Sequence, residues 1–242
     1  MEESLKRKRE DDDEEDEVLA GLGAACPPAN NNSDGGVVFV LLKASLEVGK
    51  VGKIYQLLNC DDHVHFLKKN KQNPAEYRPD IVHQALLAIL DSPLNKAGRL
   101  SAVYVQTKKN ILIKVNPHVR LPRTFKRFCG LMVQLLQKLS IRATNGPDRL
   151  LRVIKNPVTK YLPSEARRVG LSHSASKVVQ LHDYVEAVRD NVPLVFVVGA
   201  MSHGKIDADY LDDFISISQY PLSAACCIGR ICNAIERKWK IL

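Results

Sequence analysis

Two short, uninterrupted apolar runs stand out along the chain, at residues 37–42 and 194–198, and both are rich in β-branched residues. Apolar runs without polar alternation are typical of strands buried on both faces, as in the interior of a parallel sheet. Residues 102–107 and 111–115 flank a Lys-Lys-Asn turn and predict a hairpin, and residues 215–218 predict a short late strand.

Helices are indicated where apolar residues recur at three-and-four spacing. The predicted helices cover residues 81–90, 124–139 and 223–239. Asp80 precedes the first of them and is expected to be its N-cap, because a carboxylate accepts hydrogen bonds from free backbone N–H groups there. Phe125 and Phe128 are expected on the core face of the second. Strands that alternate with helices indicate an α/β fold.

Residues 1–34 lack any hydrophobic period and combine a charge block with Gly, Pro and Asn. This composition predicts a disordered tail, followed by one α/β domain at 35–242. The basic run Lys6–Arg9 is either a nuclear import signal or a solvated charge run. No apolar run approaches the roughly 20 residues of a membrane span, and the N-terminus lacks the apolar segment of a secretion signal.

Charge is divided unevenly along the chain. Residues 1–34 hold four basic and eleven acidic residues, a net charge of −7, so the rest carries +15 of a chain whose formal net charge is +8. Residues 96–146 contain no Asp or Glu, and basic residues gather in this stretch at Arg120, Arg123, Lys126 and Arg127. Arg123 and Arg127 are four positions apart and should share a helix face. Such a surface favours an anionic partner, above all RNA, over a merely solvated helix face.

The segment Gly199–Lys205 follows the second buried run and matches the first seven positions of a phosphate loop. Its eighth position is Ile206, where a Ser or Thr would ligate magnesium, and several Asp residues follow. A nucleoside triphosphatase is therefore disfavoured. A loop at the carboxyl end of a sheet strand is still where α/β proteins bind ligands, and a ligand with an adenine or ribose fits better than a triphosphate.

Three other kinds of site are weakly indicated. His63 and His65 could ligate a metal, but a capped turn in which polar side chains bond backbone groups explains the same residues better. The six cysteines form no CxxC pair, which disfavours a zinc ribbon or redox motif. Neither GxSxG nor GxGxxG occurs, which disfavours a serine hydrolase and a Rossmann enzyme. We predict no metal site.

Longer strings carry a more specific signal. They are LLNCDDH (57–63), RPDIVHQALLAILDSPLNKAG (78–98), VRLPRTFKRFCGLMVQLLQKLSIR (119–142), LLRVIKNPVT (150–159), FVVGAMSHGK (196–205) and SQYPLSAA (218–225). Together they resemble the eukaryotic ribosome-biogenesis methyltransferases that methylate N1 of a pseudouridine in small-subunit ribosomal RNA. The resemblance implies the SpoU–TrmD methyltransferase fold with a C-terminal trefoil knot, S-adenosylmethionine as cofactor, a homodimer, and a nuclear, nucleolar location.

The resemblance also implies site residues. Cofactor contacts would be Leu171, Gly199, Gly204, Ile215, Ser216, Ile217, Ser218, Gln219 and Tyr220. RNA contacts would be Arg78, Arg120, Arg123 and Arg127, the last three of which the charge pattern also selects. Asp80 is either a helix cap or a residue that orients Arg78 through an ion pair, and we favour both roles together. No general base is identified.

One function of another class competes with methyl transfer. A non-catalytic RNA-binding assembly factor could retain the same fold, although intact glycines at positions 199 and 204 argue for a working cofactor site. The expected partners are a hairpin of small-subunit ribosomal RNA and, in either case, ribosome assembly proteins.

Overall fold

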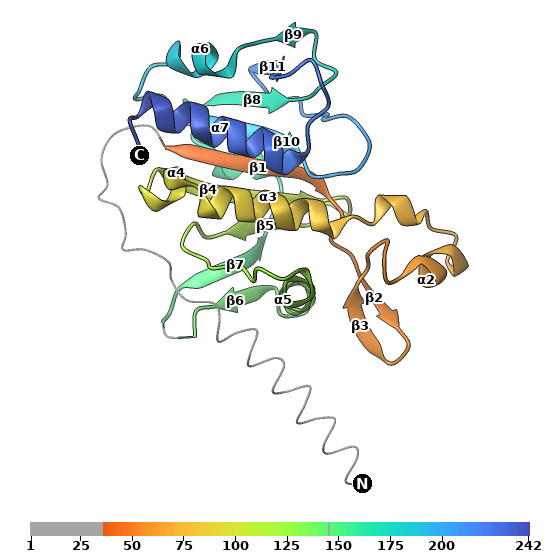
Figure 1. The fold of residues 1–242 in the computed structure, drawn as a ribbon. Coiled ribbons are helices and arrows are strands. Elements are labelled where there is room, and N and C mark those ends of the chain that lie inside the picture. The colour runs from red at the N-terminus through yellow and green to blue at the C-terminus, as the bar shows by residue number, and fades with distance from the viewer. Residues whose placement is uncertain (1–35, 145) are drawn as a thin grey trace.

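The computed structural model describes residues 36–144 and 146–242. Its centre is a nine-stranded sheet (Figure 1). From one edge to the other, the strands are β6 (Ser140–Arg142), β7 (Arg149–Ile154), β5 (Leu112–Val115), β4 (Leu100–Thr107), β1 (Val37–Ala44), β10 (Leu194–Gly199), β8 (Arg167–Leu171), β11 (Asp213–Ser216) and β9 (Lys177–Val178). The predicted tail at 1–34, with its basic run Lys6–Arg9, lies outside the described residues.

The sheet has a parallel part and an antiparallel part. Strands β4, β1, β10, β8, β11 and β9 are all parallel, whereas β5, β7 and β6 continue from β4 as an antiparallel extension. The two predicted buried strands are β1 and β10, which pair with each other at the centre of the parallel part. The predicted hairpin is β4 and β5, and the predicted late strand overlaps β11.

Helices cover one face of this sheet. Residues of α3 (Pro79–Asp91), α4 (Pro93–Lys96), α5 (Phe125–Lys138), α6 (Leu181–Glu186) and α7 (Ala224–Lys238) form the core on that face. The remaining helical elements are the short helix α2 (Val64–Lys69) and the 3₁₀ turns η1 (Pro74–Glu76) and η2 (Val158–Tyr161). In β1, Val37, Phe39 and Leu41 point into the core shared with α3, α5 and α7. The alternate residues Val38 and Val40 point to the opposite face, where η2 and the segment after β10 cover them. Both faces are therefore buried, which explains the continuous apolar runs.

Two expectations about helix starts are wrong. Helix α3 begins at Pro79, and its N-cap is Arg78, so Asp80 lies in the first turn and caps nothing. Proline at the first position presets the helical φ, and the helix starts two residues earlier than predicted. Helix α5 begins at Phe125 after its N-cap Thr124. Arg123 therefore precedes the helix and does not share a helix face with Arg127.

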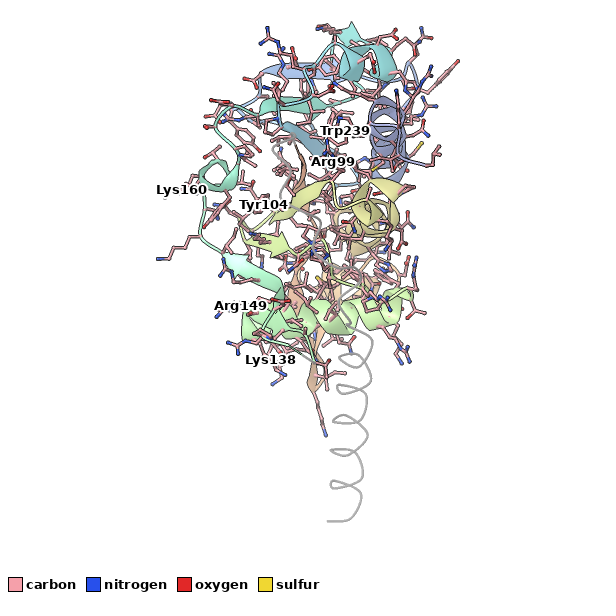
Figure 2. All side chains as sticks on the ribbon, turned by 90° about the vertical axis from the view of Figure 1, so that its left-hand side faces the viewer. Arg99, Tyr104, Lys138, Arg149, Lys160 and Trp239 are labelled. Carbon is pink, nitrogen blue, oxygen red and sulfur yellow. The ribbon has the colours of Figure 1, made fainter. Side chains whose placement is uncertain are left out.

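The C-terminal end of α7 contacts the residue that precedes β4, which is distant in sequence. Trp239 follows α7, and its ring lies 4.2 Å from the Arg99 guanidinium carbon, just before β4 (Figure 2). Ser223 caps the other end of α7 by accepting a hydrogen bond from the backbone N–H of Cys226 at 3.2 Å. The predicted helix at 223–239 is confirmed, and its buried stripe includes Ile228, Ile231 and Ile235.

The chain crosses itself beside the last strands. β11 lies between β8 and β9, although β8 and β9 are joined by only the short connection 172–176. Ile215 pairs with both Leu171 and Lys177, so that connection must cross β11, and the segment leading to α7 leaves beside it. This crossing is consistent with the trefoil knot expected from the resemblance. No helix within the described residues is long and apolar enough to cross a membrane.

Candidate functional site

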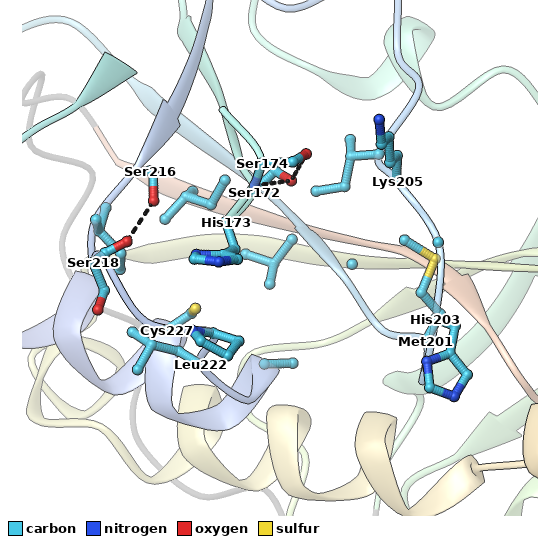
Figure 3. Close-up of a pocket in the computed structure, with 18 of the residues that line it drawn as sticks. Ser172, His173, Ser174, Met201, His203, Lys205, Ser216, Ser218, Leu222 and Cys227 are labelled. Atoms are coloured by element: carbon cyan, nitrogen blue, oxygen red, sulfur yellow. Dashed lines mark hydrogen bonds between the residues drawn. The ribbon is translucent and has the colours of Figure 1, made fainter. Parts of the chain in front are cut away.

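A cavity of about 380 Å³ opens at the carboxyl ends of β8, β10 and β11. Figure 3 shows its two sides. Ser172, His173 and Ser174 come from the connection after β8 and face Ser216 and Ser218, while Met201, His203 and Lys205 form the opposite wall. A volume of this size is typical of a small-molecule site, and the carboxyl edge of a parallel sheet is where such sites form.

Seven of the nine residues predicted to contact the cofactor line this cavity. They are Leu171, Gly199, Gly204, Ser216, Ile217, Ser218 and Tyr220. The other two do not line it. Ile215 is fully buried in the core, and its backbone oxygen accepts a hydrogen bond from the N–H of Ser172. Gln219 is exposed and lies outside the wall.

The two predicted glycines hold open the same part of the wall. A Cβ added to Gly199 would lie 3.1 Å from Met201 Cε, and one added to Gly204 would lie 3.2 Å from Met201 Sδ. Gly204 also has a φ of +125°, which side chains rarely adopt. The wall is therefore formed by backbone with Met201 between the two glycines, and a bulky residue at either position would intrude into it.

Several lining residues were not predicted, notably His173, Met201, Leu222 and Cys227. His173 belongs to the connection after β8, a short strand that hydropathy does not reveal in the sequence. Cys227 lies in the first turns of α7, where its spacing indicates only a core position. Burial raises the pKa of the Cys227 thiol to about 11, so this side chain is neutral near pH 7.

The loop after β10 is fixed from two directions. Lys43 at the end of β1 donates from Nζ to the backbone oxygen of Lys205 at 2.8 Å. The Ser202 hydroxyl donates to the backbone oxygen of Ala75 in η1 at 2.9 Å. η1 lies just before Arg78, so the cavity wall directly contacts the segment that leads to the first predicted RNA-binding residue.

Arg78 and Asp80 form a bidentate ion pair. Arg78 Nε donates to Asp80 Oδ1 at 2.8 Å, and Arg78 Nη2 donates to Oδ2 at 2.6 Å. The hydrogen bonds to Asp80 are the main cause of the raised pKa of Arg78. The predicted orienting role of Asp80 thus has the geometry it requires, while the predicted cap does not form.

Arg120, Arg123 and Arg127 are all exposed on the segment that enters α5. The expectation that few acids lie near them is wrong for Arg123, which forms a bidentate ion pair with Asp91. Asp91 is the last residue of α3, so the fold brings an acidic residue that is distant in sequence next to the stretch that contains no Asp or Glu. Arg78 and Arg123 lie near opposite ends of α3, whose 13 residues span about 20 Å.

His83 of α3 contacts the basic segment at residues 120–123. Its Nε2 lies 2.8 Å from the backbone oxygen of Pro122, and its ring stacks on Phe128 at 4.4 Å between centroids. Burial lowers the pKa of His83, so the neutral ring donates its N–H to the carbonyl. The segment between Arg120 and Arg123 therefore has a fixed position on the helix that begins beside Arg78.

The polar cluster at residues 59–63 is a capped turn. Asn59 Oδ1 accepts hydrogen bonds from the backbone N–H groups of Asp61 and Asp62 at 3.0 and 2.7 Å. His63 is buried and hydrogen-bonded through both ring nitrogens, to Asn59 N and to Gln56 Oε1. Within the described residues, no group of three His, Cys, Asp or Glu side chains could hold a metal ion.

The phosphate-loop interpretation also lacks its structural context. Residues 200–212 are all described and form no helix, so Gly204 and Lys205 do not open a helix N-terminus. Ile206 packs in the core on the helix-free face of the sheet. The segment is a wall of the cavity instead.

Comparison with known proteins places this geometry in a family. The sequence pattern of the family described as EMG1/NEP1 methyltransferase matches residues 39–236. The human ribosomal RNA small subunit methyltransferase NEP1 is 53% identical over 206 residues, which cover 85% of this chain and 83% of that protein. The Nep1 of Staphylothermus marinus, named in the same way, is 32% identical and covers 77% of this chain and 81% of that protein.

The fold matches a solved structure as well. The crystal structure of Archaeoglobus fulgidus Nep1 bound to S-adenosylhomocysteine has a TM-score of 0.68 and 26% sequence identity. The match covers 85% of this chain and 99% of that chain.

Proposed function

Because the chain belongs to the EMG1/NEP1 methyltransferase family, we propose that it transfers a methyl group from S-adenosylmethionine to N1 of a pseudouridine in small-subunit ribosomal RNA. The observation that carries this proposal is the cavity at the carboxyl ends of β8, β10 and β11, with its wall of backbone at Gly199 and Gly204. A related protein with this fold binds S-adenosylhomocysteine, the product of methyl transfer from S-adenosylmethionine.

The cavity suits S-adenosylmethionine in size and in chemistry. Apolar side chains of Leu171, Ile217 and Leu222 offer surface for an adenine ring, and backbone groups beside Gly199 and Gly204 can approach closely enough to read its polar edge. When bound, S-adenosylmethionine would supply an electrophilic methyl group on its sulfonium. The residues of this chain hold that group in place and shield it from water.

The acceptor follows from the chemistry of the base. Pseudouridine is joined to ribose through carbon and therefore keeps a free N1–H, which uridine lacks. The main contribution of the protein is to hold N1 about 3 Å from the methyl carbon and to stabilise the ring as its proton leaves. The target base must leave its stack to reach the cavity, which is easier in a loop than in a duplex.

The basic surface is suited to hold the RNA strand during this step. Arg78 is the predicted RNA contact nearest in sequence to η1, which touches the cavity wall through Ser202, and Asp80 fixes its guanidinium. Arg120, Arg123 and Arg127 extend the surface from there. Planar guanidinium groups bind phosphates in pairs of hydrogen bonds and stack on unpaired bases.

A non-catalytic assembly factor is the alternative. It predicts a cavity that no longer binds S-adenosylmethionine, whereas methyl transfer requires that the cavity bind it. Titration calorimetry with S-adenosylmethionine separates the two. No binding to the folded protein would favour the assembly factor.

We also propose a homodimer that acts in the nucleolus with ribosome assembly proteins. Beside the cavity, large apolar side chains are exposed on the edge strand β9 (Val178, 55%), on the neighbouring strand β11 (Phe214, 38%) and in the loop after it (Tyr220, 74%). Apolar exposure at an edge strand is a surface that a second copy would cover. Light scattering of the purified protein tests the dimer, and imaging of the tagged protein tests its location.

The function itself is tested in cells that depend on this protein. Depletion should remove one N1-methylated pseudouridine from small-subunit RNA, measured by nucleoside mass spectrometry, and the wild-type gene should restore it. A Gly204→Val gene should restore the protein but not the modified nucleoside. An unchanged nucleoside after depletion would contradict the proposed reaction.

A further inference from the structure

A small hairpin stands apart from the main sheet. β2 (Val48–Val51) and β3 (Ile54–Leu57) form their own two-stranded sheet, and Figure 1 shows it projecting away from the main sheet, below α2 and to the right of α5. Its tip exposes two large apolar side chains, Ile54 and Tyr55, with exposed fractions of 57% and 56%. An exposed aromatic ring on a projecting hairpin contributes nothing to the core, which suggests a role in binding.

The pairing of the two strands tells which residues share a face. Lys50 pairs with Tyr55, and Val48 pairs with Leu57, so these four residues lie on one face of the hairpin. The base of this face packs into the main core, because Leu57 is buried there and Val48 packs against the same cluster. β3 contacts α5. Lys50 and Tyr55 therefore lie on the same face of the hairpin as Val48 and Leu57, but nearer the tip and outside the core.

The charge around this tip is positive. Lys50 and Lys53 are exposed, and neither has an ion-pair partner within the described residues. Glu47, at the base of the hairpin, is already paired with Lys109 at 2.5 Å. The next acids along the chain are Asp61 and Asp62, in the capped turn before α2, where Asp62 accepts from the Asn59 side-chain amide.

The hairpin adjoins α5, the helix whose first turn belongs to the basic surface. β3 contacts α5, and Leu57 of β3 and Phe128 of α5 belong to the same buried core, which places the hairpin beside that helix. The first turn of α5 carries Lys126 and Arg127, both exposed. A strand of RNA that follows Arg120 and Arg127 would thus reach the hairpin next.

We propose that this hairpin tip is a stacking platform for an unpaired base of the substrate RNA, outside the target nucleotide. Tyr55 stacks on that base, and Lys50 and Lys53 contact the flanking phosphates. Exposed aromatic rings between lysines are the usual means of holding single-stranded RNA. The proposal rests on the proposed function, since it extends the RNA surface of the same enzyme.

The test uses the full-length protein and a hairpin RNA that carries pseudouridine in its loop. Tyr55→Ala should weaken RNA binding roughly 5- to 150-fold, the range expected for losing one stacked base. Tyr55→Phe keeps the ring and should bind like wild type. Ile54→Ser, on the opposite face of the hairpin, is the matched control and should also leave binding unchanged.

The contact is also measurable without activity. 2-Aminopurine placed at successive loop positions should lose fluorescence at one position when wild-type protein or Tyr55→Phe binds, but not with Tyr55→Ala at saturating concentration. Replacing Lys50 and Lys53 with Gln should reduce the slope of log affinity against log salt by about one unit per residue. S-adenosylmethionine binding and the melting temperature should be the same in all variants, because the tip lies outside the core.

The outcomes separate this proposal from the function. If the wild-type protein transfers no methyl group to the RNA, the proposed function fails. If the wild type is active and Tyr55→Ala binds RNA as tightly as wild type, the stacking platform is refuted while the function stands. Loss of binding in both Tyr55→Ala and Tyr55→Phe would overturn stacking in favour of a hydroxyl contact. Unchanged RNA binding with lost capture of small-subunit proteins would make the tip a protein-docking site instead.

Discussion

The cavity proposed to bind the cofactor and the basic surface differ in the kind of residues that form them. The cavity is lined by backbone at two glycines together with apolar and small polar side chains, which come from distant parts of the chain and meet because β8, β10 and β11 end at one edge. The basic surface consists of long charged side chains on two segments, the start of α3 with Arg78 and residues 120–127 at the entry to α5. His83 and Asp91 of α3 contact the second segment. The cavity selects its ligand by shape, and the basic surface by charge. Changes in the cavity should therefore affect cofactor affinity, and changes in the basic surface should affect RNA affinity and its salt dependence.

The largest effect is expected at Gly204. Gly204→Val places a branched side chain at a φ of +125° and against Met201, where strain of this kind amounts to about 1–3 kcal/mol before any lost ligand contact. That strain alone should lower S-adenosylmethionine affinity by about 5- to 150-fold, since each 1.4 kcal/mol is a factor of ten, and lost ligand contacts would lower it further. Calorimetry measures this, and RNA affinity should hardly change.

Gly130→Ala provides the matched control. Gly130 lies in α5, and a Cβ added there meets nothing within 4 Å. This variant should bind the cofactor like wild type. Normal cofactor affinity in Gly204→Val would move the cofactor site away from the cavity.

The second effect concerns the basic surface. Replacing Arg123 and Arg127 together with Gln should reduce the salt slope of RNA binding by about one unit per residue and leave cofactor binding intact. Lys155→Gln with Lys160→Gln removes the same charge elsewhere, and Figure 2 shows Lys160 pointing away from the body. An equal loss in the control pair would mean that total charge, and not this surface, determines binding.

A smaller effect is expected for the residue that orients Arg78. Asp80→Asn removes the charged partner of Arg78 but keeps the side-chain shape, so kcat/KM for RNA should fall about tenfold, or 1.4 kcal/mol. Stability should change by less than about 1 kcal/mol, because both side chains are partly exposed.

Asp91→Asn makes the same exchange at the other end of α3. It releases Arg123 from its ion pair and should leave RNA affinity equal or slightly higher. If Asp80→Asn behaved like Asp91→Asn, the orienting role of Asp80 would be wrong.

The smallest effect on ligand binding is expected at Asp213, which joins the strands beside the cavity and acts on stability instead. Asp213 at the start of β11 accepts hydrogen bonds from Tyr184 of α6 and from Arg167 of β8, the latter at 2.9 and 2.6 Å. These partners lower the pKa of Asp213 below its ordinary value of 3.8, with the Tyr184 hydrogen bond as the main cause. The carboxylate therefore stabilises the fold above about pH 4, and this contribution disappears as pH falls through the lower folded-state pKa.

Asp213→Asn should thus lower the free energy of unfolding by roughly 1–2 kcal/mol at pH 7 and flatten its acid dependence. Urea titrations between pH 3 and 7 measure both. Burial raises the pKa of Tyr184 to about 12, so ionisation of its neutral hydroxyl should contribute to a loss of wild-type stability between pH 10 and 12, and Tyr184→Phe should reduce that alkaline loss. An acid dependence that stays the same in Asp213→Asn would refute this role.

The two regions also differ in how far the sequence predicts them. β1, β10, the β4–β5 hairpin and helices α3, α5 and α7 follow from apolar runs and helical periodicity, because each is long or fully buried. The basic residues of the surface follow from local charge. The partner of Arg123 does not, since Asp91 reaches it only through the packing of α3 against the entry to α5.

Local sequence patterns do not predict most of the cavity. β8, β9 and β11 are short, and the position of β11 between β8 and β9 depends on non-local pairing that no window of sequence contains. Gly199 and Gly204 are visible as glycines after a strand, but His173 and Leu222 enter the wall only through the chain crossing. Resemblance to a family therefore located this region better than periodicity did.

Methyl transfer from labelled S-adenosylmethionine to two matched hairpin RNAs, one with pseudouridine and one with uridine at the target, tests the central claim most directly. The basic surface should hold both RNAs with similar affinity, so only turnover should differ. The pseudouridine RNA should accept one methyl group per strand, identified as N1-methylpseudouridine by nucleoside mass spectrometry, and the uridine RNA none. Equal labelling of both RNAs would contradict transfer to N1 and point to another ring atom or a ribose hydroxyl.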